Sequence, residues 1–178
     1  MMIKLKETTM VKPAEKSPPR RLWMSILDMM NNPNHVPLIY LYRSSGVSNF
    51  FDTNVLKQAL SKVLVTFYPL AGRFRLDGGG RIEIDCNDEG VLFVAAETSS
   101  VIDDFGDCAP TPEIRRLIPT VDYSLGISSY PFLLIQQLGF QGEGGEGGRG
   151  REVKKRGWWI FSICQKPGGC IKLSQPCN

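Results

Sequence analysis

Residues 72–98 read GRFRLDGGGRIEIDCNDEGVLFVAAET, and this stretch decides the fold class. Residues 72–76 and 81–87 alternate polar and apolar side chains with a period of two, which is typical of β-strands. Asp77 and three glycines join the two runs, and glycine accepts the positive φ that a tight turn requires. The pattern predicts a β-hairpin.

A third strand is expected at residues 90–98, after a turn at residues 87–90. Its apolar run is nearly continuous, which indicates a strand buried on both faces. Three sequential strands of this kind predict a meander.

A helix is predicted to begin at Asp52, upstream of the hairpin. Its apolar positions form one stripe with the helical period of 3.6 residues, and they are Val55, Leu56, Ala59, Leu60, Val63, Leu64 and Phe67. Asp52 or Thr53 can cap the first free N–H groups, and Pro69 ends the helix.

Four further elements are expected. Residues 37–43 (PLIYLYR) and 131–140 (PFLLIQQLGF) are rich in residues that favour strands. Residues 101–105 and 113–118 favour short helical turns among prolines. With the helix and the hairpin, these elements predict an α/β fold.

Composition divides the chain near residue 138. An apolar content of 42% with 22% charged residues is typical of a globular protein with about one domain. Residues 1–138 carry 14 Lys+Arg against 15 Asp+Glu, whereas residues 139–178 carry 7 against 3 and hold 10 of the 18 glycines. We predict a folded domain over 1–138 and a disordered, glycine-rich, basic tail over 139–178.

Several functional classes are excluded or disfavoured. No run of about 20 apolar residues and no signal peptide is present, so we expect a cytoplasmic protein without a membrane span. Five cysteines without a C-x-x-C pair favour free thiols. His35 is the only histidine, which excludes metal sites built on two or more histidines, and we expect no metal. On position alone, His35 is more readily a structural residue than a catalyst.

Three short motifs carry little weight. Residues 142–147 match G-x-G-x-x-G, but more glycines and basic residues follow where a dinucleotide site needs a helix. Residues 104–106 (DFG) lack the other kinase motifs and favour an acidic turn. The basic run at 149–156 beside Trp158 and Trp159 favours a solvated tail over a nucleic-acid arm or membrane patch, so we expect no nucleic-acid partner.

Longer motifs carry a resemblance to a known family. They are Leu22-Trp23, His35, Pro37, residues 40–43 (YLYR), 50–52 (FFD), 67–73 (FYPLAGR) and 81–87 (RIEIDCN). In this order they resemble the N-terminal part of plant BAHD acyltransferases, and within that family most closely the hydroxycinnamoyltransferases. The resemblance continues through residues 117–119, 121–123 and 128–131 and ends near residue 137.

The resemblance implies an incomplete N-terminal domain of the chloramphenicol-acetyltransferase-like two-domain fold, with a mixed sheet and flanking helices. It further implies an enzyme that transfers the acyl group of hydroxycinnamoyl-CoA to a hydroxyl of shikimate or quinate. The acyl-CoA is a substrate, and no permanently bound cofactor is expected. In the family, the histidine of an H-x-x-x-D motif takes the proton from the acceptor hydroxyl.

This sequence departs from the family at that motif. It has no second histidine, and Ile39 stands four positions after His35, so no catalytic residue is assigned and the chain itself is expected to be inactive. By resemblance, His35 and Tyr40 are predicted to line the substrate pocket. Leu38 stands where hydroxycinnamoyltransferases often carry a small hydroxyl residue. The alternative is a non-catalytic fragment that binds a ligand or associates with a full-length relative.

Overall fold

The computed structural model describes residues 2–26, 35–43, 51–99, 112–140 and 156–164, and their strands form two sheets. The five-stranded sheet runs, in order, through β1 (Ile3–Val11), β6 (Val91–Thr98), β7 (Leu133–Phe140), β8 (Arg156–Cys164) and β3 (His35–Arg43). The three-stranded sheet runs through β2 (Arg21–Trp23), β5 (Ile82–Asp85) and β4 (Arg73–Leu76).

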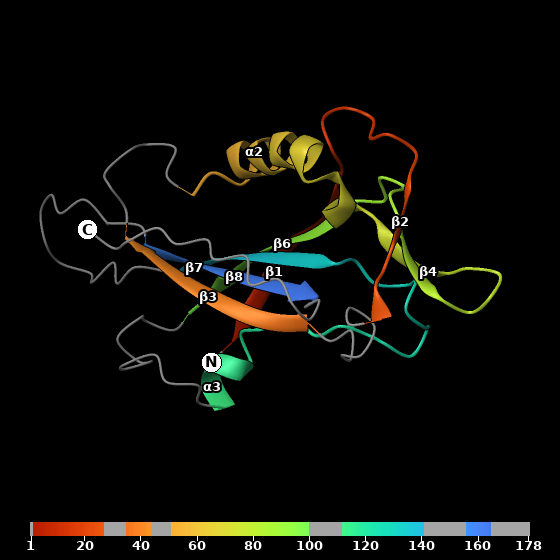
Figure 1. Cartoon of the computed structure of the whole chain (residues 1–178). Helices are drawn as coiled ribbons and strands as arrows, with labels where there is room; N and C mark the ends of the chain where they lie inside the picture. Colours follow the sequence, from red (N-terminus) through yellow and green to blue (C-terminus); the bar gives the residue numbers. More distant parts are fainter. Residues whose placement is uncertain (1, 27–34, 44–50, 100–111, 141–155, 165–178) are drawn as a thin grey trace, which may run out of the picture.

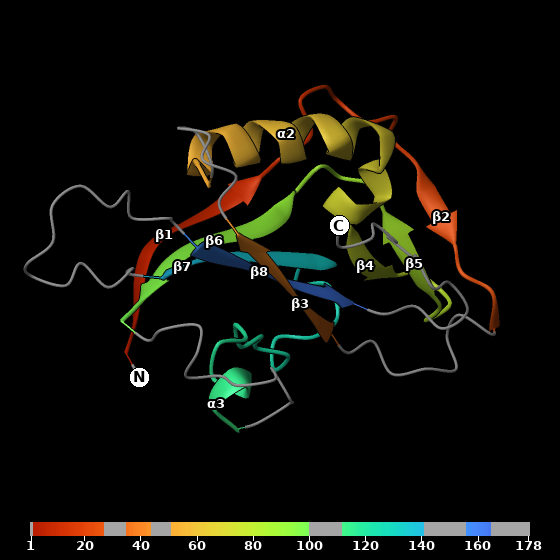
Figure 2. The same cartoon turned by 90° about the vertical axis from the view of Figure 1, so that its left-hand side faces the viewer.

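Two helices lie on opposite sides of the larger sheet. Figures 1 and 2 show α2 (Thr53–Thr66) over one face and α3 (Pro112–Arg115) below the other. We call these the α2 face and the α3 face. A 3₁₀ helix, η1 (Tyr68–Ala71), links α2 to β4.

The predicted helix is confirmed. The Asp52 carboxylate accepts hydrogen bonds from the backbone N–H groups of Asn54 and Val55, which caps the first turn of α2. The helix ends at Thr66, before Pro69. Leu64 is fully buried and belongs to the main cluster on the α2 face. The other buried members of this cluster are Val11, Ala71, Val91, Phe93, Ala95, Leu133 and Ile135.

The predicted hairpin is confirmed, but the predicted meander is wrong. Strands β4 and β5 pair antiparallel around the turn that begins at Asp77. Strand β6, the next in sequence, belongs to the larger sheet instead, where it lies between β1 and β7. The physical reason is its apolar run, because a strand buried on both faces is most stable in the interior of a large sheet.

The larger sheet is mixed, as expected. Strands β6 and β7 are parallel, and the other neighbouring pairs are antiparallel. The strands predicted at 37–43 and 131–140 are confirmed as β3 and β7. The turn predicted at 113–118 is confirmed in part as α3, and residues 101–105 lie outside the described residues.

The expected disorder of residues 139–178 is wrong for Arg156–Cys164. This segment forms β8, which pairs with β3 on one side and β7 on the other. Residues 157–164 (GWWIFSIC) consist mainly of aromatic and β-branched residues, which favour strands, and the two neighbours satisfy the backbone of β8 along both edges. Gly139 and Phe140 of the predicted tail are also ordered, as the end of β7. Residues 141–155 and 165–178 lie outside the described part, as do the motifs at 104–106 and 142–147.

Cys86 is a free, buried thiol, as predicted, and burial raises its pKa. Cys108, Cys170 and Cys177 lie outside the described residues. In the described part of the chain, no helix is long and apolar enough to cross a membrane. Among the same residues, no group of three or more His, Cys, Asp or Glu side chains could hold a metal ion.

Candidate functional site

Strand β3 carries both residues that were predicted to line a substrate pocket. It is an edge strand of the larger sheet and pairs with β8 through an unbroken register from His35 to Arg43. Because side chains alternate along a strand, His35 and Tyr40 lie on opposite faces and roughly 16 Å apart. The structure therefore does not bring these two residues together.

The imidazole of His35 is held by two hydrogen bonds. Its Nε2 lies 2.8 Å from the carbonyl oxygen of Pro131, and its Nδ1 lies 2.9 Å from the Tyr123 hydroxyl. A carbonyl only accepts hydrogen bonds, so Nε2 carries the proton and Nδ1 accepts from Tyr123 in the neutral ring. The backbone N–H of His35 also donates to the Tyr123 hydroxyl, at 3.2 Å.

Two tyrosines enclose the same ring. The centroid of the His35 ring lies 5.9 Å from that of Tyr123 and 5.6 Å from that of Tyr130, and the two tyrosines meet edge to face at 4.9 Å. Burial lowers the pKa of His35 from its ordinary value, partly offset by the hydrogen bond to Pro131. The ring is therefore neutral near pH 7, and both nitrogens are occupied.

Lowering the pH from 7.5 to 5 is expected to destabilise the fold through His35. Its pKa is below 6.5 in the folded state, so in acid the unfolded chain binds a proton that the folded chain resists. The stabilisation from the neutral ring is complete above pH 6.5 and declines as the pH falls below it. Urea unfolding at several pH values measures this slope.

The control for this prediction is His35→Gln, which removes the only imidazole of the chain. The variant is expected to lose most of the pH dependence between pH 5 and 7. An unchanged slope in the variant would assign the effect to other groups.

Leu38 and Tyr40 lie on the α2 face of β3, at the side of the sheet away from β1. By register, Leu38 lies level with Ile135 and Tyr40 with Gln137, across β8. Leu38 is 43% exposed and Tyr40 is half-buried. Tyr40 is therefore placed where a ligand on this face could reach it, and its role in substrate binding stays a prediction.

The sequence analysis missed the residues that hold His35. Tyr123 and Tyr130 lie in the coil before β7, 88 and 95 positions after His35. Gln137 was also missed: its amide donates to the Phe51 carbonyl and accepts from the Thr53 hydroxyl, which fixes the start of α2 on the sheet. A pair of glutamines in the otherwise apolar run at 131–140 was the available signal.

Comparison with protein families matches residues 1–145 to the Transferase family. The chain belongs to this BAHD Transferase family. The family match ends within the glycine-rich segment, and the resemblance of the N-terminal region is confirmed.

Among curated relatives of this BAHD chain, shikimate O-hydroxycinnamoyltransferase of Nicotiana tabacum is 57% identical over 141 residues, covering 79% of this chain and 32% of the relative. Hydroxycinnamoyltransferase of Narcissus pseudonarcissus is 54% identical over 142 residues, covering 79% and 33%. Rosmarinate synthase of Plectranthus scutellarioides is 48% identical with the same coverage. The chain spans about a third of the length of these relatives.

The crystal structure of vinorine synthase matches the fold with a TM-score of 0.67 at 24% identity, over 91% of this chain and 38% of that one. This likeness shows a shared fold alone. Its coverage exceeds the 79% covered by the curated relatives, so the structural match includes residues beyond the matched sequence.

Proposed function

We propose that this BAHD chain is the N-terminal part of an acyl-CoA-dependent O-acyltransferase. The reaction moves a hydroxycinnamoyl group from its CoA thioester to a hydroxyl of shikimate or quinate. The observation that carries the proposal is the 57% identity to the tobacco shikimate O-hydroxycinnamoyltransferase. Relatives named for N-acylation of anthranilate are 46% identical, which favours a hydroxyl acceptor over an amine.

We further propose that these 178 residues do not catalyse the transfer alone. A neutral alcohol is a poor nucleophile, and general-base catalysis contributes about 10²- to 10⁴-fold to such a step. The only imidazole is that of His35, whose two nitrogens already contact Pro131 and Tyr123. Ile39 occupies the position of the aspartate in an H-x-x-x-D motif built on His35.

The purified 178-residue chain is therefore expected to form no p-coumaroylshikimate from p-coumaroyl-CoA and shikimate above the uncatalysed rate. Chromatographic detection of product measures this, with the tobacco relative as the positive control. A cooperative urea transition, recorded on the same preparation, shows that the chain is folded. Steady product formation that scales with chain concentration would overturn the proposed inactivity.

A second candidate function is association with a full-length relative. Among the described strands, β3 lies at the edge of the larger sheet, and its Val36 and Leu38 side chains are 38% and 43% exposed. These apolar side chains favour a partner that covers β3 on its α2 face. The match to this chain covers about a third of each relative, so the relatives contain further elements that could provide that partner.

A sedimentation arm of the same experiment tests association. The chain is mixed with the tobacco relative, and the variant Leu38→Lys is compared with Leu125→Lys, which changes a 79% exposed leucine outside the strand. Co-sedimentation that only Leu38→Lys abolishes supports the second candidate. Independent sedimentation of the unmodified chain excludes it.

A further inference from the structure

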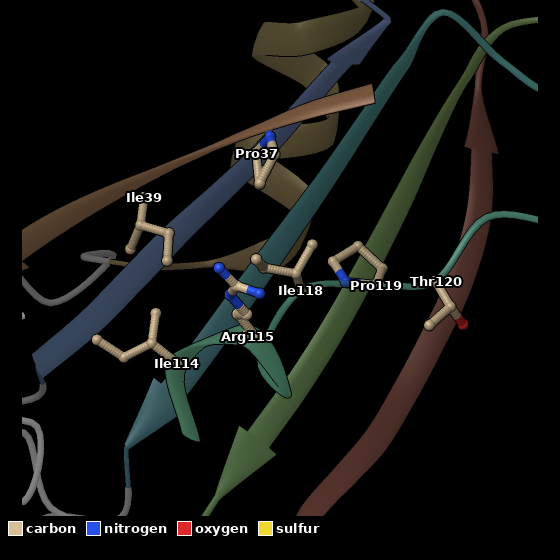
Figure 3. Close-up of a pocket in the computed structure, with 7 residues that line it drawn as sticks. All are labelled: Pro37, Ile39, Ile114, Arg115, Ile118, Pro119 and Thr120. Carbon is tan, nitrogen blue, oxygen red and sulfur yellow. The ribbon is translucent and has the colours of Figure 1, made fainter. Parts of the chain in front are cut away.

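A groove opens on the α3 face of the larger sheet, between its edge strand and the turn that follows α3. Its volume is about 560 Å³, within the range of small-molecule sites. Figure 3 shows its lining, which consists of Pro37, Ile39, Ile114, Arg115, Ile118, Pro119 and Thr120. The groove is on the opposite side of β3 from Leu38 and Tyr40, because odd and even positions of a strand face opposite ways.

The lining of the groove is mainly apolar, and part of it is packed against the buried core. Ile114 is 4% exposed and belongs to the buried cluster on the α3 face, against which Ile39 and Ile118 pack. A hydrogen bond joins the turn after α3 to the sheet: the side-chain amide of Gln136 in β7 donates to the Leu117 carbonyl at 2.7 Å. The apolar surface is therefore held in place by the sheet.

Arg115 supplies a positive charge to this apolar groove. Arg115 lines the groove, and in Figure 3 its guanidinium lies between Ile114 and Ile118 in the view. None of the ion pairs within the described ranges involves Arg115, and its side chain is exposed. A guanidinium presents a planar fork of donors that matches a carboxylate. The groove thus combines hydrocarbon walls with one anion-binding group.

We propose that this groove binds a small apolar carboxylate. The hydrocarbon part of the ligand lies against the prolines and isoleucines, and its carboxylate pairs with Arg115. The groove lies on the opposite face of the sheet from Tyr40, and binding there needs no CoA, so the proposal does not depend on the acyl transfer proposed above.

The test uses the full 178-residue chain and 3-phenylpropanoate, with 3-phenylpropanamide as the uncharged analogue. Titration by ligand-observed NMR is expected to give a dissociation constant of about 1 mM or tighter, as is usual for a ligand of this size. The amide is expected to bind about tenfold more weakly, because it lacks the charge-assisted hydrogen bonds.

Two matched variants decide the site. Arg115→Met is expected to weaken binding of the carboxylate about tenfold or more, whereas Arg116→Met changes an exposed neighbour that does not line the groove and leaves binding unchanged. Ile118→Trp, which fills the groove, is expected to abolish binding of both ligands. Equal losses in the two arginine variants, equal affinity for acid and amide, or no binding by the unmodified chain would each overturn the proposal.

Discussion

Replacing Ile160 by proline is expected to lower the free energy of unfolding by about 2–4 kcal/mol, because proline removes a backbone donor from the interior of a sheet. Ile160 lies at the middle of β8, level with Ile39 of β3 and Gln136 of β7. Proline removes the single backbone N–H of residue 160, so one of the two neighbouring strands loses a ladder hydrogen bond and its carbonyl is left without a donor. Urea unfolding followed by far-ultraviolet circular dichroism measures the change.

The proline substitution in β8 is also expected to disturb the position of His35 in the neighbouring strand β3. Strand β3 pairs only with β8 among the described strands, so a damaged β8 leaves β3 without its neighbour. The pH dependence of stability that arises from His35 is then expected to weaken in the proline variant. This second readout separates loss of β8 pairing from a general loss of stability.

Ile160→Val is the matched control, because valine keeps the backbone donor and favours strands. It is expected to stay within about 1.5 kcal/mol of the parent chain. A proline variant as stable as the valine variant would mean that β8 does not pair in solution, and the tail would then be disordered as its composition suggests.

Strand β8 illustrates which part of the fold the sequence could not predict. Helix α2 and the β4–β5 hairpin depend on neighbours within a few positions, such as the Asp52 cap and the glycines after Asp77, and both were predicted. The pairing of β8 with β3 joins residues more than 100 positions apart, and no local pattern encodes it. Averaging the composition over residues 139–178 concealed an apolar run at 157–164 among the glycines.

The same limit applies to the candidate site. The sequence indicated that His35 is more readily structural than catalytic, and its two hydrogen bonds agree with that interpretation. Its partners Tyr123 and Pro131 are 88 and 96 positions away, so they could not be named from spacing. The prediction of a meander failed for a related reason, since local alternation cannot reveal which sheet a strand joins.

Gly90→Ala is expected to cost about 2–4 kcal/mol of folding free energy, because two penalties coincide at this residue. Gly90 has a φ of 102°, which side-chain-bearing residues rarely adopt. A Cβ on Gly90 would also lie 2.6 Å from the backbone oxygen of Val11 in β1. Backbone atoms of a paired strand cannot move aside as a flexible side chain can.

Gly78→Ala in the hairpin turn is the matched control. Gly78 does not have a positive φ, and an added Cβ would meet nothing within 4 Å. This variant is expected to be neutral or slightly stabilising, by up to about 1 kcal/mol, since alanine restricts the unfolded chain. Thermal and urea unfolding of the two variants compare the same chemical change at two positions.

A displacement of Gly90 is expected to disturb neighbouring elements as well, because η1, β4 and β1 all contact this residue. The N–H of Gly90 donates to the Ala71 carbonyl, and its own carbonyl accepts from Arg73 at 2.8 Å. The Arg73 guanidinium also donates to the Gly72 carbonyl and pairs with Glu89 at 3.0 Å, while its side chain is only 7% exposed. A shift of Gly90 breaks one of the buried hydrogen bonds of Arg73, which adds to the cost. If Gly90→Ala and Gly78→Ala prove equally stable, the junction between the two sheets must be looser than these contacts indicate.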